Sequence, residues 1–171
     1  MMGNNIKDIQ SQHTAWVESM GWHNKQPLEY LALIGSEVGE AVNECRGSTP
    51  SDTLGSELAD IILRVLDFAS TQGFDIGSVD NFRGRSFKDV QASYTDIDPA
   101  NMLPLEHLAS VIYAVGKAIR ECKSATASDK LKHALLVIFI MVLDFANTQG
   151  ICMDTEISKK MEVNLKYLKT N

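Results

Sequence analysis

Apolar side chains recur along most of the chain at the three- and four-residue spacing of amphipathic helices. One such stretch starts at Pro27, a residue favoured in the first helical turn, and we expect it to end at Gly47. A second stretch begins after Ser51 or Asp52, either of which can cap a helix, and ends at Gly73. The apolar positions are 31, 34, 38, 41, 42 and 45 in the first stretch and 58, 61, 62, 65, 66 and 69 in the second.

Two more amphipathic helices are predicted outside this pair, over residues 6–20 and 154–167. Residues 77–104 are polar, mixed and poor in periodicity, so we expect a linker there, which could include a short helical turn. No stretch of the sequence alternates apolar and polar residues as a strand does. The chain is therefore expected to form a single all-α domain, a helical bundle.

The chain contains two copies of one unit. Residues 28–76 (copy one) align without a gap on residues 105–153 (copy two), and 23 of the 49 aligned positions are identical. Unrelated sequences of ordinary composition would share about three. Each copy is expected to form a helical hairpin, and the second hairpin ends at Gly150, the counterpart of Gly73.

Composition restricts the classes of function. A net charge of −6 and a pI near 5.2 argue against nucleic acid or an anionic membrane as a partner. The N-terminus lacks the apolar core of a signal peptide, and the most apolar run, residues 134–143, is too short for a bilayer, which needs roughly 20. We expect a soluble cytoplasmic protein, in which the three cysteines are free thiols: Cys45, Cys122 and Cys152.

The duplication separates the acids of copy one into two groups. Glu44 and Asp67 persist in copy two as Glu121 and Asp144, so we interpret them as structural. Four other acids are lost together, and mostly to apolar residues, which suggests that their positions are buried. These are Glu37, Glu40, Glu57 and Asp60, which are replaced by Ala114, Lys117, Ala134 and Val137.

The spacing of the four lost acids indicates a metal site. Glu37 and Glu40 share one helix face, as do Glu57 and Asp60, and a short loop makes the two helices antiparallel neighbours. Burying several unpaired carboxylates would cost several kcal/mol each, and a bound cation would offset that cost. Carboxylates without histidine suit Mg²⁺ or Mn²⁺, whereas a di-iron bundle would favour a Glu-x-x-His motif.

The pattern Glu-x-x-Glu, sixteen residues, Glu-x-x-Asp, with "SEVGEA" and the closing "KKMEVN", resembles the all-α nucleoside triphosphate pyrophosphohydrolases, which include the MazG-like proteins and the dimeric dUTPases. The likeness covers residues 12–73 and 157–167. It implies a magnesium-dependent cleavage between the α- and β-phosphates that releases a nucleoside monophosphate and pyrophosphate. The four lost acids would be the metal ligands, and Glu37 or Glu40 would orient or deprotonate the attacking water; the sequence leaves open which.

The resemblance also implies where the substrate binds. The segment after Gly73 does not match the basic helix of the family, but the final helix does, so Lys160 and Asn164, with Lys159 or Lys166, would contact the phosphates and sugar. The chain would then be a fused, asymmetric dimer with one composite site, and we expect it to pair again as a homodimer. The base preference stays open between dUTP-like and non-standard nucleotides, and Trp16 and Gln12 are candidates for contacting the base.

An alternative from another class is a nucleotide-binding or oligomerisation protein that keeps this fold without turnover, which the degenerate copy two favours. Three expectations concern other polar side chains. We expect His13 and His23 on the surface and Arg64 paired with Glu44 or Asp67. The basic side chains of the linker are expected to be exposed, with a lid over the phosphates as the alternative: Arg83, Arg85 and Lys88.

Overall fold

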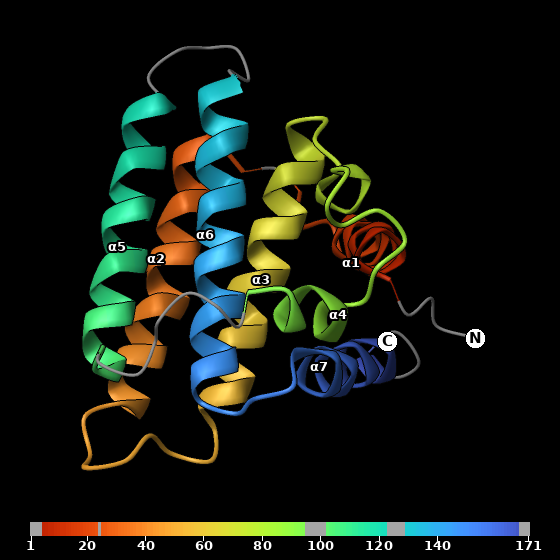
Figure 1. Cartoon of the computed structure of the whole chain (residues 1–171). Coiled ribbons are helices and arrows are strands. Elements are labelled where there is room, and N and C mark those ends of the chain that lie inside the picture. Colours follow the sequence, from red (N-terminus) through yellow and green to blue (C-terminus); the bar gives the residue numbers. More distant parts are fainter. Residues whose placement is uncertain (1–4, 24, 95–101, 123–128, 168–171) are drawn as a thin grey trace.

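The computed structural model describes residues 5–23, 25–94, 102–122 and 129–167 (Figure 1). These residues form helices and no strand, so the predicted all-α fold is confirmed. In chain order the helices are α1 Ile6–Ser19, α2 Pro27–Glu44, α3 Leu54–Thr71, the 3₁₀ turn η1 Ile76–Ser78, α4 Phe87–Ala92, α5 Pro104–Glu121, α6 Asp129–Thr148 and α7 Met153–Tyr167.

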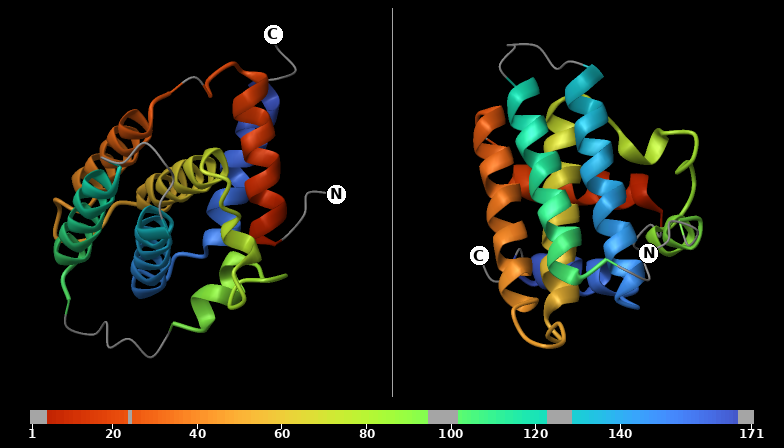
Figure 2. Two further views of the ribbon diagram at one scale, coloured as in Figure 1. Left: turned by 90° about the horizontal axis from the view of Figure 1, so that it is seen from above. Right: turned by 60° about the vertical axis from the view of Figure 1, so that its left-hand side comes forward.

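Four long helices form the body of the molecule. The hairpins α2/α3 and α5/α6 pack together so that α2 contacts α5 and α3 contacts α6 (Figures 1 and 2). The shorter elements α1, α4 and α7 gather on the other side, where α1 and α7 both pack against α3. The core follows the predicted apolar periodicity: for example, Leu58 and Ile62 on α3 and Leu135 and Phe139 on α6 are fully buried.

At the loop that joins α2 to α3, the helix ends differ from the sequence expectations. Neither Ser51 nor Asp52 caps α3, because the helix begins at Leu54 after Thr53 and has no side-chain cap. The hydroxyl of Ser51 donates instead to the carboxylate of Glu44, where α2 already ends. The loop is therefore tied to α2, and both helices are shorter than expected at this end.

The opposite end of the hairpin agrees with the prediction. Gly73 follows the last turn of α3 with a φ of +65°, and its counterpart Gly150 follows α6 with a φ of +67°. A left-handed residue at this position closes a helix, and glycine adopts that conformation without strain.

The segment between the copies, expected to be a polar linker that could include a short helical turn, forms the short helix α4 and packs against the core in its described part. Phe82 and Phe87 are buried, and their rings lie 5.7 and 6.1 Å from Phe139 of α6. The two arginines of this segment are held within it: Arg83 pairs with Asp80 at 2.9 Å, and Arg85 donates to backbone oxygens of the same segment. Residues 95–101 lie outside the described part of the chain.

The repeat is longer than the hairpin. The sequence Ile-Lys-Asp-Ile-Gln at the start of α1 (residues 6–10) recurs as Phe-Lys-Asp-Val-Gln at the start of α4 (residues 87–91). Gln10 accepts from the backbone N–H of Ile76 at 3.0 Å, and Gln91 accepts in the same way from Met153, the counterpart of Ile76. Both units therefore begin with a helix whose buried glutamine holds the chain that leaves the hairpin.

Within the described ranges, α6 alone is long and apolar enough to cross a membrane by length and composition. One such helix is weak evidence for a membrane. Five of its apolar side chains are fully buried, as in the core helix of a soluble protein: Leu135, Ile138, Phe139, Val142 and Leu143.

Candidate metal and substrate site

Three of the four lost acids meet between α2 and α3. Glu37 and Glu40 lie one turn apart on α2, and Glu57 lies in the first turn of α3. Each offers a carboxylate oxygen within 4.8 Å of the other two. We call these three residues the acid cluster. Glu37 and Glu57 are half-buried and Glu40 is exposed, so the cluster opens to solvent on one side.

The fourth acid, Asp60, is not part of this close group. Its carboxylate pairs with the ammonium of Lys160, which belongs to α7, the helix that follows copy two. Asp60 still lies near the cluster, because its charge raises the pKa of both Glu37 and Glu57. The structure therefore assembles the predicted quartet as three adjacent glutamates and one aspartate that is engaged with a lysine.

The acid cluster carries more negative charge than its protein surroundings offset. Burial raises the pKa of Glu37, and the neighbouring charges of Asp60 and Glu40 act in the same direction, against Arg64. Burial also raises the pKa of Glu57, and Asp60 adds to this effect. Carboxylates whose pKa is raised by burial and by one another are suited to a cation, which favours their charged form.

Arg64 pairs with a member of the cluster, contrary to expectation. Its Nε lies 3.1 Å from Oε1 of Glu37. Neither expected partner is available: Glu44 accepts from the hydroxyls of Ser51 and Thr53, and Asp67 accepts from His23. Arg64 thus places a guanidinium beside the acids, as Lys160 places an ammonium there.

Helix α7, which follows copy two, reaches the acids of copy one. It packs along α3, and Lys160 is its point of contact with Asp60. Asn164 follows one turn later and is half-buried. Lys159 forms an ion pair with Glu156 at 2.7 Å instead, so of these two adjacent lysines Lys160 is the one placed at the acids.

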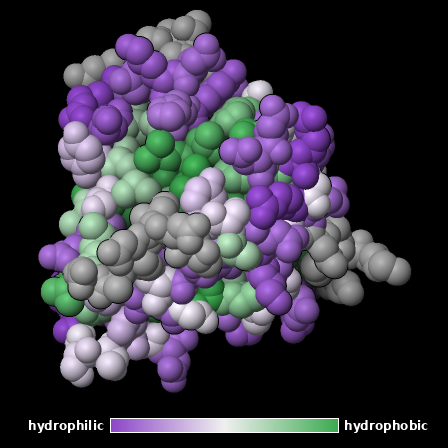
Figure 3. Space-filling view, in the orientation of Figure 1, coloured by the Kyte–Doolittle hydropathy of each residue, from purple (hydrophilic) through white to green (hydrophobic). Residues whose placement is uncertain are grey.

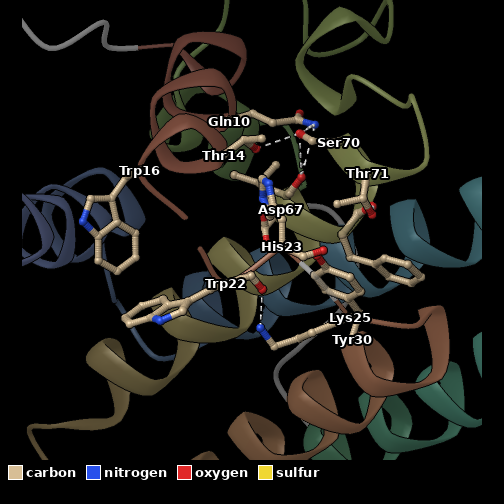
Figure 4. Close-up of polar contacts among 12 residues, drawn as sticks. Gln10, Thr14, Trp16, Trp22, His23, Lys25, Tyr30, Asp67, Ser70 and Thr71 are labelled. Atoms are coloured by element: carbon tan, nitrogen blue, oxygen red, sulfur yellow. Dashed lines mark hydrogen bonds and ion pairs between the residues drawn. The ribbon is translucent and has the colours of Figure 1, made fainter. Parts of the chain in front are cut away.

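An aromatic group lies on α1 and the loop after it (Figure 4). The rings of Trp16 and Trp22 meet edge to face at 5.3 Å, and His13 stacks on Trp16 at 5.6 Å. The expectation that His13 is a surface residue was wrong, because it is buried. Its Nδ1 and the Nε1 of Trp16 are both buried without a hydrogen-bond partner among the described residues. Gln12, also on α1, is half-buried.

The charge state of His13 connects this aromatic group to the acid cluster. Burial lowers the pKa of His13 to about 4, and the positive charges of Arg64 and His23 contribute to the shift. His13 is therefore neutral near pH 7 and lies close enough to Arg64 to feel its charge. Arg64, which pairs with Glu37, is the residue whose charge acts on His13.

His23, also expected on the surface, is a half-buried partner of Asp67. The two side chains are 2.8 Å apart, and the hydroxyl of Tyr30 donates to the backbone oxygen of His23 (Figure 4). The sequence contained one indication of this contact. Asp67 lies on the apolar face of α3 and recurs in copy two, so a buried carboxylate in need of a partner could be anticipated.

Comparison of the chain with protein-family models, with curated proteins and with solved structures returned no match. The resemblance to the all-α pyrophosphohydrolases therefore depends on the motif residues alone.

Proposed function

We propose that this chain is a metal-dependent nucleoside triphosphate pyrophosphohydrolase, which converts a nucleoside triphosphate and water into the monophosphate and pyrophosphate. The observation that carries the proposal is the acid cluster: three glutamates from two helices bring their oxygens within 4.8 Å. They are grouped in this way only in the copy that keeps the acidic motif. Copy two has the same helices but alanine or lysine at the corresponding positions.

The donor set fits Mg²⁺ or Mn²⁺. Hard divalent cations prefer carboxylate oxygens, and Glu37, Glu40 and Glu57 offer these without a competing histidine or thiol. Asp60 would join them once Lys160 turns to the substrate. When bound, the ion would neutralise phosphate charge and lower the pKa of a water molecule.

The chain's own side chains can bind and orient the substrate. Lys160 and Arg64 each pair with one of the acids. Their ammonium and guanidinium groups can also donate charge-assisted hydrogen bonds to phosphate oxygens. Glu37 or Glu40 would accept the proton of the attacking water. Trp22, which is exposed, and Trp16, which meets it edge to face, would provide aromatic surface for a base.

The second candidate is a nucleotide-binding protein without turnover. The observation that favours it is the pairing of Glu37 with Arg64 and of Asp60 with Lys160, because these ion pairs offset part of the acidic charge without a metal.

The test is pyrophosphate release from a panel of ribo- and deoxyribonucleoside triphosphates with Mg²⁺ or Mn²⁺. We expect release by the native chain and not by the Glu57→Ala variant. Asp80→Ala is the matched control, because Asp80 is an exposed acid in the segment between the copies. Metal binding measured by calorimetry without release from any nucleotide would reject the enzyme and leave the second candidate.

A further inference from the structure

The groove between α5 and α6 is the counterpart, in copy two, of the acid cluster in copy one. A hollow of about 410 Å³ and an adjoining one of about 540 Å³ share three lining residues, Ala114, Lys117 and Val137. These occupy the positions of Glu37, Glu40 and Asp60. Copy two therefore has a hollow at the positions where copy one carries the acids, and its size lies in the range of small-molecule sites.

The floor of this groove is apolar and open. Ala134, Val137 and Met141 of α6 are only partly buried, and Figure 3 shows apolar side chains gathered over the middle of α6. Every residue that lines the two hollows belongs to α5 or α6. In copy one, α7 packs on α3 and its Lys160 pairs with Asp60, the counterpart of Val137. Among the described residues, no element other than α5 and α6 lines the groove of copy two.

The centre of the groove carries a positive charge where copy one carries a negative one. Lys117 stands where copy one has Glu40, and the three other acidic positions are alanine or valine. The ammonium of Lys117 lies 5.7 Å from the centre of the Tyr113 ring and forms no ion pair with a described residue. Charges of both signs stand at the loop end of the groove, where they offset one another: Glu121, Asp129 and Lys130, with His133 beside them.

We propose that this groove is a metal-independent binding site for a small organic anion with a flat apolar body. The anionic group would pair with Lys117, and the body would cover Ala114, Ala134 and Val137. Lys117 supplies the positive charge that a bound cation would supply in copy one. When the apolar body of the ligand excludes water from Lys117, the attraction between the ammonium and the anionic group becomes stronger. The apolar body and the anionic group would therefore each strengthen the binding of the other.

The site can be tested on the full chain in EDTA with 8-anilinonaphthalene-1-sulfonate, an aromatic anion that fluoresces when bound. We expect saturable binding that Lys117→Glu weakens at least about tenfold and that Lys117→Arg preserves. The uncharged analogue N-phenyl-1-naphthylamine is expected to change less than about threefold with the same variants. Lys117 is exposed, so the variants should fold, which circular dichroism checks.

Two controls separate this site from the rest of the molecule. Lys88→Glu reverses an exposed lysine on α4, and Glu40→Ala removes a proposed metal ligand; neither should alter binding of the anionic probe. Three outcomes would overturn the proposal: no saturable binding to the native chain, equal affinity in Lys117→Glu, or equal loss of the charged and the uncharged probe. None of these bears on pyrophosphate release, so the two proposals fail independently.

Discussion

The hairpins α2/α3 and α5/α6 share a frame and differ in chemistry. Tyr30 stacks on Phe68 with ring centres 5.0 Å apart, and their counterparts His107 and Phe145 stack at 5.2 Å. At the start of α2 the carboxylate of Glu29 accepts from the backbone of Gln26, and Glu106 does the same at the start of α5. These contacts lie away from the acid positions, so the frame does not depend on what those positions carry.

The difference between the hairpins shows that the acids are not needed for folding. Copy two replaces them with residues that a protein core accepts readily, and its helices keep their lengths to within two residues. In copy one the same positions hold carboxylates whose pKa burial raises, which opposes folding when they are charged. The acids of copy one therefore do not serve stability, and this is the reason to test them for the proposed metal.

The largest expected effect comes from giving copy one the residue of copy two. We expect Glu40→Lys to lower turnover at least about a hundredfold, because it removes a carboxylate from the acid cluster and adds a repelling charge for the metal. Pyrophosphate release at saturating nucleotide measures this. Glu44→Ala is the comparison, because Glu44 is present in both copies and contacts the hairpin loop. Equal losses in the two variants would contradict the division of the acids into two groups.

A second difference lies in the helices that precede the hairpins. Helix α1 is fourteen residues long and α4 only six, so only α1 extends to a buried histidine, His13. Its pKa falls from 6.5 to about 4 on folding, so between these values the unfolded chain binds the additional proton. Stability is therefore complete above pH 6.5 and falls by roughly 3 kcal/mol as the pH drops towards 4.

The test of this pH dependence is urea unfolding of the native chain and of His13→Leu at pH 7.5 and 4.5. Leucine is close in volume to histidine and does not titrate. We expect the loss of stability between the two pH values to be smaller in the variant. An identical loss in both proteins would assign the pH dependence to other groups.

The equivalent glutamines Gln10 and Gln91 should contribute similar amounts to the free energy of unfolding. Gln10→Ala leaves the N–H of Ile76 and the oxygen of Phe74 without their partner, and Gln91→Ala does the same to Met153 and Ile151. Unsatisfied buried groups cost about 1–3 kcal/mol, so we expect each variant to lose about 2 kcal/mol in urea unfolding. Gln10 also donates to the hydroxyl of Ser70, so Gln10→Ala should be slightly less stable than Gln91→Ala. A neutral Gln91→Ala would mean that the two helices are alike only in sequence.

The sequence was sufficient for the long helices and the duplication, because apolar spacing and a 77-residue shift are local patterns. It was insufficient for α4, since six residues are too few to show a helical period. It also failed for the partner of Arg64, which depends on how α2 packs against α3, and for the burial of His13, which depends on how α1 packs against α3. Gly77 illustrates the limit. A Cβ there would lie 2.4 Å from the backbone nitrogen of Lys7, and the apolar periodicity of the sequence does not predict this close approach.

The smallest expected effect concerns the two adjacent lysines of α7. Lys160 contacts Asp60 and Lys159 contacts Glu156, so the same substitution at each compares a lysine at the acids with one outside them. We expect Lys160→Ala to raise KM for the nucleotide about tenfold with little change in kcat, because binding a phosphate oxygen is lost in ground and transition states alike. Lys159→Ala should leave both constants unchanged. If Lys160→Ala instead lowered kcat and left KM alone, the ammonium would act on the reacting phosphate, and α7 would belong to the catalytic machinery rather than to the wall that holds the substrate.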